Sequence, residues 1–290
     1  MTDAKNRLPE PLCHENYRPL RKGIYDDTEI VVMVNEAADF AFLDPMPSTD
    51  YTKYVPRVEQ LGLHSYKSTN KAVLRRLEKV ETVLGLVVSM LEVGAGDGSF
   101  LALAKERFPS IEYFAVEPDQ NTSPARDTLP WLKHFSTLEA AVSAGVRVDL
   151  VGLFHVFEHI ESPGSFLASI KRLLALGGVV LIEVPCLLDP LLNLLKSESY
   201  ESFYFQRQHP YVYSGPSLRR VLEREGFSIT RMIYFQRYGL ENHIQWLSAG
   251  RPGGNDELRH LFQDVDGHYR RALEDSGNTD TVIVEARLAH

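Results

Sequence analysis

Cysteine is scarce in this sequence, which has 290 residues and only two thiols, Cys13 and Cys186. Two distant cysteines cannot build a four-cysteine zinc site, and one pair is no disulfide framework. We therefore expect two free thiols in a reducing compartment. No run of residues reaches the roughly 18 uninterrupted apolar positions that a membrane helix needs. The polar start, residues 1–21, lacks the apolar segment of a signal peptide, so we expect a cytoplasmic protein without a membrane span.

Positively charged residues are also relatively few: the chain has 31 Lys and Arg residues and 39 Asp and Glu residues, which gives a formal net charge of -8. Nucleic-acid binding depends on clustered Lys and Arg side chains that neutralise phosphates. The composition therefore argues against nucleic acid as the main partner. Internal repeats and low-complexity segments are absent as well. The length suits one large α/β domain with a small appendage.

The first 69 residues show few signs of regular structure. Prolines are spread through them, and only the run Glu29–Val34 is typical of a strand. Proline restricts regular structure, yet the many aromatic side chains of this segment need a surface to bury against. We therefore predict an accessory or lid segment, residues 1–69, that wraps over a neighbouring domain.

Strands and helices alternate from about Thr69 onward. Asn70 can cap a helix in which apolar residues recur at helical spacing as far as Leu84. The predicted strands that follow are Ser89–Val93, Ile111–Val116, Trp131–Phe135, Val148–Phe154 and Val179–Val184. The predicted helices between them are Ser99–Arg107, Thr137–Ser143 and Ser165–Leu176, the last of which Gly177 and Gly178 end.

The C-terminal part continues this pattern with a helix at Ser217–Glu225 and strands at Phe227–Phe235 and Thr281–Leu288. Residues 239–278 look like an insertion between those two strands. Apolar strands that alternate with helices predict a parallel sheet with helices on both faces. Ligands of such sheets bind at the carboxyl ends of the strands, so one ligand-binding domain over residues 70–290 is expected.

A glycine-rich loop follows the first strand of this domain, with the spacing Gly94-x-Gly96-x-Gly98. Glycines at such a turn let the backbone approach a ligand closely. The dinucleotide-binding fingerprint needs its third glycine one position later, where Ser99 stands, and the Gly-Lys-Ser/Thr of a P-loop is missing. Glu92 and Asp97 would repel a pyrophosphate but attract the cationic amino and sulfonium groups of S-adenosylmethionine (SAM).

A second carboxylate ends the next strand, in Val116-Glu117-Pro118. At that position an acidic side chain can accept both hydroxyls of a ribose. The glycine loop and Glu117 together favour a cationic nucleoside as the ligand.

In these motifs the chain resembles the class I SAM-dependent methyltransferases, in particular the group acting on sugars, surface polysaccharides and small metabolites. The resemblance spans about residues 72–238. The matching segments are Leu91 to Ser99, Glu117, Asp149-Leu150-Val151, Phe157-Glu158-His159-Ile160 with Pro163, and Leu173 to Gly178. It implies a Rossmann-like fold with a seven-stranded, mostly parallel sheet, one antiparallel strand and helices on both faces.

The resemblance also implies roles for individual residues. The first acid and the glycine loop would hold the methionine part of SAM, and the second acid the ribose. The residues after the third and fourth strands would line the adenine and face the cofactor or substrate. The positions concerned are Glu92, Gly94, Ala95, Gly96, Asp97 and Gly98, then Glu117 and Pro118, then Phe135 and Ser136, and finally Phe154 and His155.

The segment His155-Val156-Phe157-Glu158-His159 also spells an inverted zincin motif. Zinc hydrolysis needs that motif on a helix, whereas here it directly follows a buried strand. In the family the Glu-His pair is usually a structural hydrogen-bonding element, although some relatives that methylate catechol-like compounds hold a divalent metal with a similar pair. We predict no metal, and leave the pair Glu158/His159 open on this point.

A segment rich in tyrosine, Tyr204 to Ser214, follows the fifth strand. It resembles the Glu-His-x-x-Tyr-x-Ser segment of sugar C-methyltransferases, with Gln208 in place of the Glu. Methyl transfer to a hydroxyl needs a base within hydrogen-bond reach of the proton, and a histidine suits that task near neutral pH. We predict His209 as this base and His155 as the second candidate, with the acceptor site shaped by Tyr204, Tyr211 and Tyr213; a His209 that only orders the loop is the structural alternative.

The sugar C-methyltransferases carry an amino-terminal zinc module of cysteines, of which this chain has only Cys13. That departure favours an oxygen acceptor. The stretch from Arg237 to Gly254, including His243, resembles a segment of bacterial surface-glycan methyltransferases and would bind the acceptor. Alternatively, it packs on the core or on a second subunit, which would make a homodimer.

The resulting prediction is a SAM-dependent enzyme of polysaccharide or small-metabolite biosynthesis that methylates a hydroxyl of a sugar, a glycan or a related compound. Two other hypotheses stay open. One keeps SAM but places the methyl group on nitrogen, carbon or a macromolecular side chain. The other is a SAM-binding scaffold without chemistry.

Overall fold

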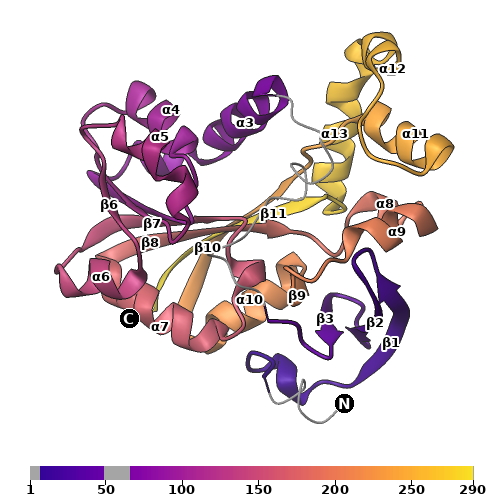
Figure 1. Cartoon of the computed structure of the whole chain (residues 1–290), viewed down its shortest axis with the longest axis horizontal. Coiled ribbons are helices and arrows are strands. Elements are labelled where there is room, and N and C mark those ends of the chain that lie inside the picture. Colours follow the sequence, from indigo (N-terminus) through magenta and orange to yellow (C-terminus); the bar gives the residue numbers. More distant parts are fainter. Residues whose placement is uncertain (1–6, 49–65, 290) are drawn as a thin grey trace.

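The computed structural model describes residues 7–48 and 66–289, which form two sheets with helices around them. Figure 1 shows the larger sheet across the molecule and the smaller one beside it. The larger sheet has the strand order β10-β11-β8-β7-β4-β5-β6, and the smaller one the order β1-β2-β3-β9. Among the helices within the described ranges, none is long and apolar enough to cross a membrane.

The larger sheet consists of β4 (Ser89–Val93), β5 (Glu112–Val116), β6 (Lys133–Phe135), β7 (Val148–Phe154), β8 (Leu174–Pro185), β10 (Phe227–Phe235) and β11 (Thr281–Leu288). The pairs β4/β5, β4/β7, β5/β6 and β7/β8 are parallel, whereas β11 runs antiparallel to both of its neighbours. The predicted Rossmann-like sheet with one antiparallel strand is therefore confirmed. Four of its seven strands, β4, β7, β10 and β11, begin and end where the sequence predicted.

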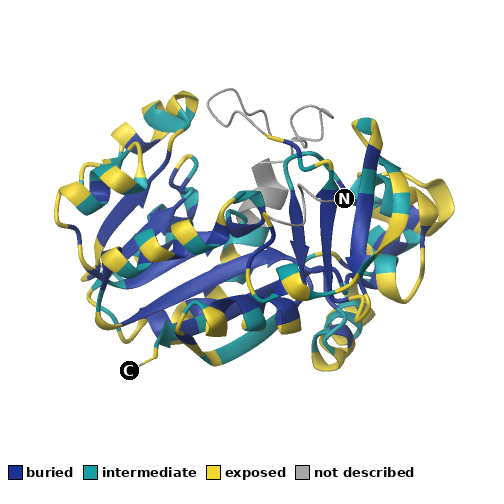
Figure 2. Cartoon of the chain, turned by 90° about the horizontal axis from the view of Figure 1, so that it is seen from below, coloured by how far each residue is buried: buried dark blue, intermediate teal, exposed yellow. Residues whose placement is uncertain are grey.

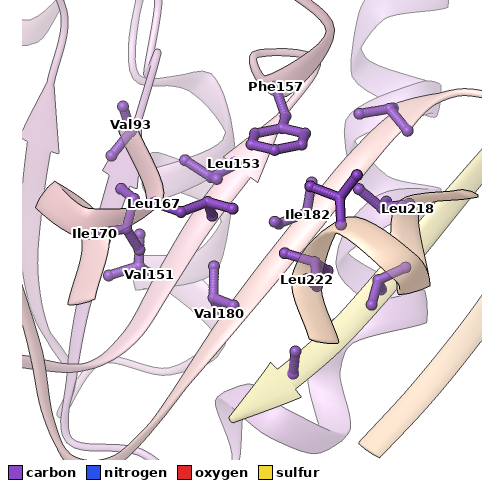
Figure 3. Packing of buried hydrophobic residues seen from close by; sticks show 14 of the residues in the cluster. Val93, Val151, Leu153, Phe157, Leu167, Ile170, Val180, Ile182, Leu218 and Leu222 are labelled. Carbon is purple, nitrogen blue, oxygen red and sulfur yellow. The ribbon is translucent and has the colours of Figure 1, made fainter. Parts of the chain in front are cut away.

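Helices cover both faces of this sheet, because its strands are apolar on both sides (Figure 1). One face carries α3 (Tyr66–Leu84), α4 (Ser99–Arg107) and α5 (Ser123–Asp127); the other carries α6 (Leu138–Ser143), α7 (Pro163–Leu173) and α10 (Gly215–Arg224). Figure 3 shows Leu167 of α7 and Leu222 of α10 packed on the strands, with Phe157 at the end of the cluster. Figure 2 shows the central strands buried and the outer faces of the helices exposed.

The largest differences from the predicted boundaries lie at the start of α3 and where α7 meets β8. Helix α3 begins at Tyr66, before the proposed cap Asn70, and α7 ends at Leu173 rather than Leu176. Leu174 adopts an extended conformation and pairs with Val148, so β8 begins there and includes both glycines that were expected to end the helix. The apolar pattern of the helix continues into the strand and hides the boundary.

The prediction of an irregular amino-terminal segment is wrong for residues 17–44, although the predicted strand Glu29–Val34 lies within an observed strand. After a short turn, η1 (Leu12–His14), β1 (Tyr17–Ile24), β2 (Asp27–Asn35) and β3 (Phe40–Asp44) form an antiparallel sheet. Its fourth strand, β9 (Tyr211–Tyr213), comes from the other half of the chain and pairs with β3. Pro19 lies on the edge strand β1, where a missing backbone N–H costs little. Sheet pairing with β9 thus anchors residues 7–44 to the larger domain.

The remaining helices follow the last parallel strand. Helices α8 (Pro190–Asn193) and α9 (Glu198–Tyr204) lie between β8 and β9. The expected insertion, residues 239–278, is helical: α11 (Leu240–Ala249), α12 (Asp256–Leu261) and α13 (Gln263–Ser276). Trp246 of α11 packs its ring against Tyr200 and Phe203 of α9, so the insertion is attached to the segment that leads to β9.

Candidate functional site

The glycine loop lies between β4 and α4, at the carboxyl edge of the parallel strands. Gly94, Gly96 and Gly98 have φ values of +72°, +54° and +83°, which residues with a side chain rarely adopt. A Cβ on Gly94 would come within 2.4 Å of Val156 Cγ2, whereas a Cβ on Gly96 would meet nothing within 4 Å. Gly94 therefore lets the loop after β7 approach, and Gly96 faces open space in which a ligand fits.

Glu92, just before this loop, is the acid best suited to a cation. Its side chain is buried, and Oε2 has no hydrogen-bond partner among the described residues. Burial raises the pKa of Glu92 to about 8; Arg76 lowers it, while Asp97, Glu117 and Glu183 raise it further. A buried carboxyl oxygen without a donor, beside other acids, fits the cationic groups of SAM.

The other two acids are engaged by the backbone. Asp97 Oδ1 accepts hydrogen bonds from the N–H and the hydroxyl of Ser99, at 3.0 and 2.6 Å, and so fixes the start of α4. Glu117 Oε2 accepts from Gly96 N at 2.8 Å, and its Oε1 accepts from Asp119 N at 2.9 Å. Each carboxylate oxygen keeps a second lone pair, so Glu117 can still accept from a diol.

The residues expected to line the adenine lie next to the hydrogen bond that joins Glu117 to Gly96. Pro118 and Ser136 are exposed, Ala95 is buried, and Phe135 is half-buried with its carbonyl accepting from Glu117 N at 3.0 Å. The structure thus brings the ends of β4, β5 and β6 together, as the predicted cofactor contacts require.

Arg126 of α5 is a residue of this cradle that the sequence analysis missed. Its guanidinium is buried and donates hydrogen bonds to Gly96 O, to the Thr122 hydroxyl and, at 3.3 Å, to Asp119 O. It ties the loop after β5 to the glycine loop. A single arginine in a short helix gives no sequence signal of this role.

Phe154 and His155 end β7, and both are held by charged neighbours. The Phe154 ring is buried, 4.6 Å from the Phe100 ring, with the Arg76 guanidinium 4.9 Å from its centre. His155 has a φ of +58°, an unusual conformation for a residue with a side chain. Backbone strain of this kind persists where surrounding contacts enforce it, often at functional sites.

Both ring nitrogens of His155 contact protein groups. Nδ1 lies 3.2 Å from Glu158 Oε1, and Nε2 lies 2.9 Å from Glu183 Oε1 and 2.7 Å from Arg237 Nη1. Arg76 in turn binds both oxygens of Glu183, at 2.6 and 2.9 Å. His155 is therefore the centre of a buried network of charges.

Glu183 is the most buried acid of this network. Burial raises its pKa, but Arg76 and the hydrogen bond with His155 outweigh burial and hold the pKa well below its usual range. Arg237, which meets the same ring nitrogen of His155 as Glu183, pairs with Asp280 at 3.3 Å. Of these residues only Arg237 lies in a segment assigned from the sequence, although a Glu inside the apolar run Val179–Val184 is a signal that could have found Glu183.

His209 lies in the turn before β9, next to the other histidine of the motif. The His159 and His209 rings are 4.8 Å apart at an angle of 66°, and the Gln206 side-chain nitrogen lies 3.0 Å from His209 Nε2. His159 Nδ1 lies 2.6 Å from Gln208 O. The structure thus brings the loop after β7 and the predicted base together.

The predicted acceptor residues lie deeper in the fold. Tyr211 and Tyr213 are buried; the Tyr211 hydroxyl donates to the carbonyls of Arg7 and Glu161. The half-buried Tyr204 donates to Cys186 O at 3.0 Å. These tyrosines hold the segment around His209 in place, and a direct contact with the acceptor stays a prediction.

His243 of α11 is buried, with Nδ1 2.6 Å from the Tyr269 hydroxyl of α13 and Nε2 3.3 Å from Gln236 Nε2. Burial lowers the pKa of His243 to about 4, against a raising effect of Asp280. It is therefore neutral at pH 7 and links the helices of the insertion, and its role in acceptor binding also stays a prediction.

Known proteins with a similar sequence are methyltransferases. The family model described as "Methyltransferase domain" matches residues 63–231, more than half of the chain. Methyltransferase str2 of Strobilurus tenacellus is 26% identical over 160 residues, which cover 49% of this chain and 58% of that protein. The chain thus spans a little over half the length of this curated relative.

Two solved structures share the fold. A SAM dependent methyltransferase from Archaeoglobus fulgidus has a TM-score of 0.51 at 18% identity, over 75% of this chain and 94% of that chain. A chain of the complex between the Haloferax volcanii Trm112 methyltransferase activator and the putative methyltransferase also has a TM-score of 0.51, at 14% identity, over 77% of this chain and 94% of that one.

Proposed function

Because the chain belongs to the family of methyltransferase domains, with SAM as its cofactor, we propose that it transfers a methyl group to a hydroxyl of a sugar, a glycan or a related small metabolite. The observation that carries this proposal is the buried Oε2 of Glu92, which has no hydrogen-bond partner among the described residues and precedes the glycine loop in which Gly96 faces open space. This acid would repel the pyrophosphate of a dinucleotide, whereas the cationic amino group of SAM would supply a donor of opposite charge.

In this proposal Glu92 and Glu117 bind different parts of the cofactor. Glu92 attracts its cationic end, and Glu117 accepts from the ribose hydroxyls while it holds the backbone of Gly96 in place. Bound SAM supplies an electrophilic methyl carbon on a sulfonium. The contact of Gly94 with Val156 sets the glycine loop against the turn that carries Glu158 and His159, so cofactor and acceptor groups lie side by side.

The base of the reaction is His209. His155 is a poorer choice, because a carboxylate meets each of its two ring nitrogens and Arg237 lies beside Nε2. His209 accepts the hydroxyl proton as the new oxygen–carbon bond forms and the carbon–sulfur bond breaks, with the bonding electron pair left on sulfur. A neutral hydroxyl is a weak nucleophile and needs such a base, whereas an unprotonated nitrogen can attack the methyl carbon before it loses a proton.

The proposal is tested with tritium-labelled SAM and a panel of nucleotide sugars, methyl glycosides and oligosaccharides, with peptides and amines for comparison. We expect label on a hydroxyl of a carbohydrate-like acceptor, and a loss of at least about 100-fold in turnover for His209→Gln with SAM affinity unchanged. Label only on nitrogen or carbon would contradict the hydroxyl acceptor. Binding of SAM without transfer to any acceptor would favour a scaffold.

A further inference from the structure

The carboxylate of Glu158 lies among three histidines and is almost inaccessible to solvent. The residue is 1% exposed, in the turn η4 (Phe157–His159) that follows β7. Its Oε1 lies 3.2 Å from His155 Nδ1, while Oε2 is buried and has no hydrogen-bond partner among the residues that the structure describes. A buried carboxylate oxygen without a donor is costly, so this atom marks a place where a positive charge or a proton is stabilised.

Two imidazoles lie on the other side of this carboxylate. One ligand-type atom from each of Glu158, His159 and His209 lies within 4.8 Å of the others. The contact of His159 Nδ1 with the carbonyl of Gln208 requires a proton on Nδ1, since a carbonyl only accepts. The neutral His159 ring is thereby held in the tautomer that carries its proton on Nδ1 and none on Nε2.

The charges of this cluster are coupled. Burial raises the pKa of Glu158, but the hydrogen bond with His155 and the charges of His159, His155 and His209 outweigh it and bring the pKa down to about 2. Coupling is reciprocal, because the free energy by which an imidazolium stabilises a carboxylate also stabilises the imidazolium. At neutral pH Glu158 is therefore a fixed negative charge beside His209.

We propose that Glu158 is a positioning residue whose buried carboxylate stabilises the imidazolium of His209 after this base has taken the hydroxyl proton of the acceptor. The inference rests on the proposed function, since it names the group that supports the same base. Glu158 touches neither the acceptor nor the cofactor in this account. It acts through His209, which has a ring nitrogen near the carboxylate, while Glu158 Oε1 is held by His155.

The test follows the imidazole signals of the full chain by nuclear magnetic resonance of ¹⁵N-labelled histidine over a pH series, without any acceptor. The spectrum of His209→Gln identifies the signals of His209. In Glu158→Gln we expect the midpoint of the His209 titration to fall by about one pH unit or more, because an opposite charge within about 4–6 Å shifts a pKa by that amount or more. The control Glu161→Gln removes a half-buried acid of the same segment and should leave the midpoint unchanged.

A second variant keeps the test decisive if Glu158→Gln does not fold. Glu158→Asp keeps the charge but withdraws it by one methylene, so the midpoint should fall by a smaller step. If Glu158→Gln does not fold, this variant alone decides, and a wild-type midpoint would overturn the proposal. A stoichiometric divalent metal in the purified protein, lost in His209→Gln, would also overturn it, because the cluster would then hold a cation. Since no acceptor is used, failure here is distinct from failure of the proposed function.

Discussion

The loops after β4 and β5 are held by hydrogen bonds between nearby side chains and backbone groups, whereas the loop after β7 is held by contacts among charged side chains from distant parts of the chain. Glu117 accepts from Gly96 N, 21 positions away in the sequence. His155 contacts Arg237, 82 positions away, and Glu183 binds Arg76 across 107 positions. The cofactor side therefore depends on a local motif, and the acceptor side on long-range ion pairs.

The difference between these loops can be explained by the two ligands that a methyltransferase binds. A cofactor that stays the same can be served by one backbone arrangement, which a short sequence motif encodes. In the proposed function, the acceptor site is formed by the loop after β7 and the segment before β9. The amino-terminal sheet is joined to this segment by side-chain contacts as well as by strand pairing, as the Phe40 and Tyr213 rings, 5.3 Å apart, illustrate.

The largest effect should come from breaking the ion-pair network on the acceptor side. Glu183→Gln leaves Arg76 and His155 without their shared carboxylate, so we expect the free energy of unfolding to fall by about 3–5 kcal/mol. Urea denaturation measures this change. The control is Glu112→Gln, which removes the exposed pair of Glu112 with Lys133 and should cost less than about 1 kcal/mol. An equal loss in the free energy of unfolding for the two variants would contradict the claim that the loop after β7 depends on its buried ion pairs.

A somewhat smaller effect is expected on the cofactor side from Gly94→Ala. The new Cβ would overlap Val156 and also force alanine into a left-handed conformation, so we expect a loss of about 2–3 kcal/mol in stability and weaker SAM binding. Thermal denaturation and calorimetry measure the two quantities. Addition of Val156→Ala removes the overlapping methyl group and should recover part of the stability, whereas no recovery would show that the contact with Val156 is unimportant.

The smallest of these effects concerns the missed arginine. Arg126→Gln removes the hydrogen bonds to Gly96 O and Asp119 O but leaves Glu117 in place, so we expect SAM affinity to fall by about tenfold or less, near 1 kcal/mol. Calorimetric titration with SAM measures it. Arg107→Gln, which removes a long exposed pair with Glu81 on the same side of the sheet, is the control and should bind SAM like the wild type.

The extent to which the sequence predicted the structure follows the same division. Strands β4 and β7 and the positions of Glu92 and Glu117 at strand ends were predictable, because apolar runs and a glycine motif encode them locally, while the cofactor roles of the two acids stay predictions. Of the amino-terminal sheet only the strand Glu29–Val34 was predicted, and its pairing with β9 was not, because β9 lies more than 160 residues further along the chain. Asp280 escaped for the same reason, since its pairing with Arg237, which contacts His155, exists only once β10 and β11 have joined the sheet.

Proton release on SAM binding tests the central claim most directly. Glu92 has a pKa of about 8 in the protein without cofactor, so at pH 7 most molecules carry the proton there. A bound cation favours the carboxylate and lowers this pKa, so binding should release protons and affinity should rise with pH up to about 8.

Calorimetric titration at pH 7 in two buffers of different ionisation enthalpy measures the number of protons released. We predict that SAM binds and releases between about half a proton and one proton, and that Glu92→Gln releases none. Absence of SAM binding, or the same proton release from Glu92→Gln as from the wild type, would contradict the assignment of Glu92 as the group that receives the cation.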